Sequence, residues 1–138
     1  MKNDMLEIVT GLIEKSKKDQ VNWVHANQVS QLMNGEWGPS DIVNDFAVST
    51  PNFTINIFES STKVNNDKLP TIRLNIHDAY GNLATHIESA VNDPDYKILE
   101  ELLDLAKAYA RDEESLLRTI KNDLRKTGVL GGDDDIPF

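Results

Sequence analysis

The chain has 138 residues, of which 39% are hydrophobic and 27% are charged, and its formal net charge at pH 7 is -9. This length fits a single domain with a real core, whereas the acidic balance disfavours autonomous binding to the phosphate backbone of nucleic acids. The absence of cysteine excludes disulfides, thiolate metal sites and a cysteine nucleophile.

The first predicted element is an amphipathic helix over residues 4–17, with Asn3 or Asp4 as its N-cap. Its apolar positions are Met5, Ile8, Val9, Leu12 and Ile13. Two basic clusters, at residues 15–18 and 121–126, are interpreted as cations that complement the negative C-terminal ends of helices. A local basic patch for nucleic acid is the alternative.

Residues 19–45 are the least periodic segment before the tail and predict an ordered but irregular connection. Trp23 and Trp37 lie in it. An aromatic residue on a loop is either a secondary binding anchor or a plug at the edge of the core with its indole N–H bonded, and the second interpretation is favoured.

The centre of the chain alternates apolar and polar residues, which predicts an antiparallel meander of three or four strands. The runs begin at Phe46 and continue over Phe53–Phe58, Ile72–His77 and Leu83–Ile87. Residues 60–68 are expected to form a flexible loop, and residues 78–82 a turn. One face of the sheet should be apolar and the other polar.

His77 and His86 fall on the predicted polar face as a near-diagonal cross-strand pair, so a metal site is conceivable. Solvated sheet residues are the favoured interpretation. Adjacent acidic pairs such as Glu100 and Glu101 do not face one another on a helix, and no catalytic motif is recognisable. We therefore expect a non-enzymatic protein without cofactor or metal.

Asp93 and Pro94 predict a helix start, with Asp93 as the cap and Pro94 at the first helical position. Apolar residues then recur from Ile98 to Tyr109, and a second stripe ends before Gly128. One long kinked helix or a helical pair satisfies this pattern. The expected architecture is one α+β domain over residues 1–127, followed by a flexible linker and an extended acidic tail over residues 128–138.

The last six residues are Asp133, Asp134, Asp135, Ile136, Pro137 and Phe138. Pro137 lacks an N–H and restricts the residue before it, so the tip should be an extended peptide. Three carboxylates, a terminal α-carboxylate and one aromatic anchor suit a basic pocket with an apolar floor. The tip is the main candidate site for a partner.

This tip resembles the C-terminal tip of bacterial single-stranded DNA-binding proteins, matching the Asp-Asp-Asp-Ile-Pro-Phe form residue for residue. In that family the tip docks replication, recombination and repair enzymes and does not bind DNA itself. The resemblance covers six residues. The family's oligonucleotide-binding barrel needs five strands in Greek-key order, which the body does not predict.

The resemblance implies a bacterial or phage adaptor or mimic that docks on genome-maintenance proteins through residues 133–138. One alternative is a single-stranded nucleic-acid binder whose acidic tail competes with DNA for its own surface. Another is a small catalytic or metal-binding domain. Met1–Asp4 lack the pattern of a signal peptide and no run reaches membrane-spanning length, so a cytoplasmic location is expected.

Overall fold

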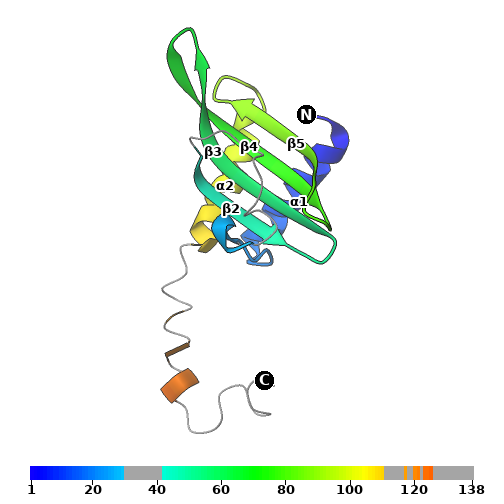
Figure 1. Cartoon of the computed structure of the whole chain (residues 1–138), viewed down its shortest axis with the longest axis vertical. Coiled ribbons are helices and arrows are strands. Elements are labelled where there is room, and N and C mark those ends of the chain that lie inside the picture. Colours follow the sequence, from blue (N-terminus) through cyan, green and yellow to red (C-terminus); the bar gives the residue numbers. More distant parts are fainter. Residues whose placement is uncertain (30–41, 111–116, 118–119, 122, 126–138) are drawn as a thin grey trace.

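A computed structural model of the chain describes residues 1–29, 42–110, 117, 120–121 and 123–125. It confirms the α+β architecture: a helix, a five-stranded antiparallel sheet and a second helix (Figure 1). The elements are α1 (Asn3–Lys17), β1 (Val24–His25), the 3-10 turn η1 (Ala26–Gln28), β2 (Val43–Ser49), β3 (Phe53–Val64), β4 (Asp67–Asp78), β5 (Leu83–Ala90) and α2 (Tyr96–Ala110). The strand order is that of a meander, β1-β2-β3-β4-β5.

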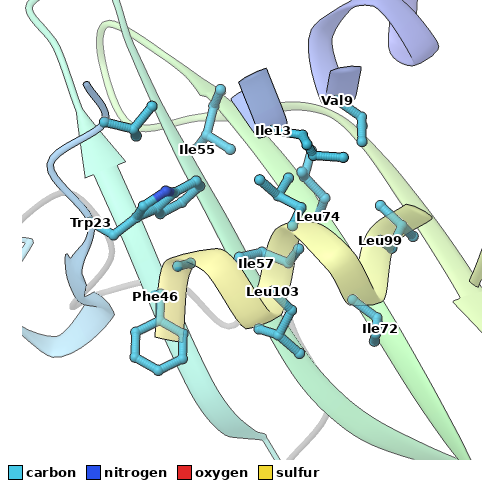
Figure 2. Close-up of a cluster of buried hydrophobic side chains, with 13 residues drawn as sticks. Val9, Ile13, Trp23, Phe46, Ile55, Ile57, Ile72, Leu74, Leu99 and Leu103 are labelled. Atoms are coloured by element: carbon cyan, nitrogen blue, oxygen red, sulfur yellow. The ribbon is translucent and has the colours of Figure 1, made fainter. Parts of the chain in front are cut away.

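The core lies between the two helices and one face of the sheet, which we call the core face. Val9 and Ile13 of α1 and Leu99 and Leu103 of α2 are buried there against Leu74 and its strand neighbours (Figure 2). Because each helix repeats its apolar residues every three or four positions, one side of it meets the sheet. Burying a Leu side chain of this kind contributes about 1.5–3 kcal/mol.

β3 and β4 form a long hairpin in which twelve residue pairs are in register, from Phe53 with Asp78 to Val64 with Asp67. The expected loop over residues 60–68 is therefore wrong, since most of it is strand. Asn65 and Asn66 make the turn with φ of 50° and 69°. Two consecutive positive φ values suit a two-residue turn whose twist matches the strands, and Asn tolerates them.

Five strands exceed the three or four expected, because the two-residue β1 adds to the edge of β2. The order nevertheless remains a meander, and not the Greek key of an oligonucleotide-binding barrel. β2 itself contains a bulge, where Asn44 and Asp45 lie opposite the single residue Phe58. Asn44 has φ of 50°, and this bulge turns Asp45 toward the face of the sheet away from the helices.

Both predicted helix caps are wrong. α1 begins at Asn3, with Lys2 in the N-cap position and no side-chain cap bond. Asp93 is not the cap of α2, which begins three residues later at Tyr96. Its carboxylate instead accepts a hydrogen bond from Ala90 N at 2.9 Å, at the end of β5.

The Asn65–Asn66 turn generates the first prediction. Replacing Asn65 by Val should lower the free energy of unfolding by about 1–2 kcal/mol, because a β-branched side chain is strained at positive φ. Asn65→Gly is the matched control and should be neutral or slightly stabilising, since Gly adopts this conformation without strain. Urea unfolding measures both; equal stability of the two variants would contradict the turn geometry.

Candidate functional site

The main sequence-predicted site, residues 133–138, and the secondary candidate Trp37 lie outside the residues that the structure describes. The predicted second helical stripe is described only at its residues 117, 120–121 and 123–125, which are helical. Leu117, Ile120 and Leu124 are 51%, 45% and 61% exposed. Because residues 133–138 are not described, the partner-binding tip stays a prediction.

Trp23 is a core residue. Its side chain is 1% exposed and lies among the core side chains (Figure 2). Its indole N–H donates to Ser16 Oγ at 3.0 Å, which ties the start of the β-sheet to the end of α1. Of the two interpretations of this tryptophan, the structure has the plug with a bonded N–H. A surface anchor at this position would need the ring to leave the core.

The face of the sheet away from the helices, which we call the second face, is polar yet buried. Asn56 pairs with Asn75 in the β3–β4 ladder, and Thr54 pairs with His77. All four side chains are at most 1% exposed. η1 lies against this face at Ala47, where Ala26 and Val29 form a small apolar cluster.

Hydrogen bonds join Asp45, Asn56 and His77 across three strands. Asn56 Nδ2 donates to Asp45 Oδ1 at 3.0 Å, so Asn56 Oδ1 faces His77 Nε2, also at 3.0 Å. An amide oxygen only accepts, which requires the proton of this imidazole to be on Nε2. The network fixes one orientation for each of the three side chains.

A second polar chain lies beside it. Arg73 Nε donates to Asn75 Oδ1 at 2.7 Å, and an Arg73 terminal nitrogen lies 3.8 Å from Glu88 Oε2. Asn75 Nδ2 is buried and has no hydrogen-bond partner among the described residues. An unsatisfied buried donor costs about 1–3 kcal/mol.

Burial shifts the pKa of Asp45 and of His77, the two ionisable groups at the ends of the network that Asn56 joins. Desolvation raises the pKa of Asp45 to about 6, against the lowering effect of its bond from Asn56. Desolvation also lowers the pKa of His77, although a backbone hydrogen bond with Gly81 and the charge of Asp78 oppose it. Each group is thus biased toward its neutral form.

The arrangement of Asp45, Asn56 and His77 suits a structural role better than acid–base catalysis. Asn56 separates the carboxylate from the imidazole, and an amide does not relay a proton as an acid–base pair would. The expectation that His77 is solvated is wrong, because this imidazole is 1% exposed. His86 is exposed, and it pairs with Asn75, which leaves the two histidines diagonal as predicted. Among the described residues, no group of three His, Asp or Glu side chains is placed to hold a metal ion.

The sequence reasoning missed Asp45. Its signal was the pair Asn44–Asp45 inside an otherwise apolar strand, which is typical of a bulge. Two lysines of the N-terminal basic cluster, Lys15 and Lys17, lie in the last turn of α1, as expected for cations at the negative end of a helix. Lys17 Nζ also lies 3.0 Å from Glu101 Oε1 of α2, a contact that was not expected. This pairing reduces the charge that the cluster offers to a phosphate.

No family model, curated protein or solved structure matches the chain. Within the described ranges, neither helix has the length and apolar character needed to cross a bilayer.

The half-buried carboxylate of Asp45 generates the second prediction. Asp45→Asn keeps an acceptor for Asn56 and removes a desolvated charge, so it should raise the free energy of unfolding at pH 7 by about 1–2 kcal/mol. The folded-state pKa of Asp45 lies above the unfolded value near 3.8, so native protein gains the proton first as pH falls. The advantage of the variant should therefore shrink between pH 7 and pH 4.

Urea unfolding at several pH values measures this difference. The lowered pKa of His77 makes both proteins lose stability as pH falls below about 6.5, and this loss cancels when they are compared. Asp104→Asn, at an exposed position of α2, is the matched control and should show no such pH dependence. A difference that stays constant from pH 7 to pH 4 would contradict the burial of the Asp45 charge.

Proposed function

We propose that the chain is a non-enzymatic protein-interaction module of DNA replication, recombination or repair, which docks on genome-maintenance proteins through residues 133–138. The observation that carries the proposal is the order of side chains in that segment, with three carboxylates directly before Ile136, Pro137 and Phe138. A merely solubilising tail does not need an apolar end, because exposed aromatic residues reduce solubility.

The partner's pocket follows from this chemistry. An apolar floor would take Phe138, and burying that ring contributes about 1.5–3 kcal/mol. Arg or Lys at the rim would donate charge-assisted hydrogen bonds to the aspartates, each worth about 1.5–3 kcal/mol before ordering costs. The net affinity is expected near micromolar and should weaken with salt.

The composition of the body supports a protein partner over DNA. The whole chain has a net charge of -9, of which Asp133, Asp134 and Asp135 supply -3, so the body itself is acidic and repels phosphate. Lys17 already has Glu101 as a neighbour at 3.0 Å. The described core draws its members from residues 1–110. A truncation in the tail therefore removes none of them, and the body should fold without the tip.

The length of the segment between the body and the tip limits how far the tip can reach from the body. From Gly128 to Phe138 a fully extended chain reaches at most roughly 35 Å. The body would then lie close to any protein that holds the tip. Such proximity suits a module that recruits or blocks its partner directly.

The tip generates the third prediction. Phe138→Ala should weaken capture of partners from a bacterial lysate by roughly tenfold or more, since the anchor ring is lost. Deleting residues 136–138 should abolish capture while the circular dichroism spectrum stays unchanged. Quantitative mass spectrometry of the captured proteins measures both effects, and a peptide of residues 130–138 should compete for the same proteins.

The matched control exchanges the two apolar residues, Ile136→Phe with Phe138→Ile. This variant has the same composition and charge but places the aromatic ring two residues earlier. A docking site with a shaped pocket should discriminate against it, whereas a solubilising tail would not. Undiminished capture by the deletion variant would refute the proposal.

A further inference from the structure

β5 is the last strand in the sheet order, and among the described elements it pairs only with β4. Its outer edge therefore presents backbone groups that a further strand can bind. Figure 1 shows this strand at the margin of the sheet, opposite β2. The sequence of β5, Leu-Ala-Thr-His-Ile-Glu-Ser-Ala, contains neither Pro nor Lys, the residues that commonly block an edge.

The hydrogen-bond alternation of β5 identifies the groups that point outward. Val91 N donates to Pro70 O of β4 at 2.9 Å, so odd-numbered residues from Thr85 onward face β4 and even-numbered residues face the open edge. Ala90 confirms this direction, because its N–H and C=O are both bonded to Asp93, each at 2.9 Å.

These contacts leave a short window. Asp93 covers the edge at Ala90, and a register shift opposite Ile76 and His77 interrupts the ladder before Thr85. Between these two limits, the outward-facing backbone groups are those of His86 and Glu88. A strand that pairs here has to satisfy two N–H and two C=O groups separated by one residue, Ile87.

We propose that this window binds a second copy of the chain, β5 against β5 in antiparallel orientation, with a two-fold axis at Ile87. In this register His86 of each copy lies opposite Glu88 of the other, and the two pairs make four N–H···O=C bonds. The axis passes through a non-hydrogen-bonded pair, as the alternation requires. The two five-stranded sheets then form one ten-stranded sheet. The proposal does not depend on the tip.

The side chains of this segment are self-complementary about Ile87, which is what a two-fold interface demands. His86 can donate a ring N–H to the Glu88 carboxylate across the axis, and this pair forms twice. Within the window, the other pairs about the axis are Ile87 with Ile87 and Thr85 with Ser89.

Neighbouring registers lack this complementarity. An axis at Glu88 would place two carboxylates directly opposite each other, and like charges in that position are destabilising. An axis at His86 would pair the two imidazoles and leave Glu88 opposite Ala84. Only the axis at Ile87 pairs the two residues with outward-facing backbone groups, His86 and Glu88, with each other. Charge and hydrogen bonding therefore select the same register, in which Glu88 also has Arg73 of its own chain at 3.8 Å.

A single cysteine tests the register, because the chain has none of its own. In Ile87→Cys the two thiols would meet at a non-hydrogen-bonded pair with Cα atoms roughly 4.5 Å apart, within the range of a disulfide. Thr85→Cys is the control, since the two copies of that residue would lie roughly 13 Å apart along the strands. Mild oxidation of the full-length protein should cross-link the first variant and spare the second.

Exchange of the charged residues tests the same pairing without altering the core. His86→Glu puts two like-charge pairs across the axis and should raise the dimer dissociation constant roughly tenfold. The double variant His86→Glu with Glu88→His restores both pairs and should recover the dimer. Sedimentation equilibrium, over concentrations up to about 1 mM, measures the fraction at twice the chain mass of 15.5 kDa.

Several outcomes would overturn the proposal. These are a full-length chain that stays monomeric throughout, equal cross-linking of the two cysteine variants, or a dimer that His86→Glu leaves unchanged. A chain that dimerises only after residues 126–138 are removed would also overturn it and would assign the edge to the tail. Circular dichroism confirms that each variant is folded before it is scored.

Discussion

The β3–β4 ladder determines where every central side chain of the domain points. Its twelve pairs place Ile55, Ile57 and Leu74 on the core face and Asn56, Asn75 and His77 on the second face. Because side chains alternate with a period of two, a slip by one residue would exchange the two sets. The apolar core and the buried polar network therefore specify one register together, and the Asn65–Asn66 turn ends the ladder in that register.

The second face explains why an acidic protein contains a carboxyl group that resists ionisation. The bulge at Asn44 and Asp45 turns one carboxylate toward the amide of Asn56, and burial holds the pKa of Asp45 near 6. Such networks stabilise a unique arrangement only when each member has its partner. The stability of the domain should therefore respond to pH through the sheet as well as through its many surface carboxylates.

The sequence predicts the fold class, the α1 stripe and the alternating strands, because apolar periodicity depends on burial and little else. It does not predict the length of the β3–β4 hairpin, since residues 60–68 are polar apart from Val64 and their strand structure comes from pairing. Nor does it predict the burial of His77, which depends on a partner 21 residues away in sequence, Asn56. The caps fail for a similar reason: Asp93 has the expected residue type, but its carboxylate binds the end of β5. The candidate tip remains a matter of sequence.

β1 has a consequence for assembly. Sheets that expose two long edges can add further copies without limit, which leads to filaments. Here β1 covers the middle of β2 with only two residues, and the bulge at Asn44 and Asp45 interrupts the regular pairing beside it. At the opposite edge, on β5, regular strand pairing is limited to the residues between the register shift before Thr85 and Ala90, whose N–H is bonded to the Asp93 carboxylate. Strand addition on β5 would use up the one regular edge among the described strands. The assembly would then close on itself, which protects a β-rich protein against open-ended aggregation at high concentration.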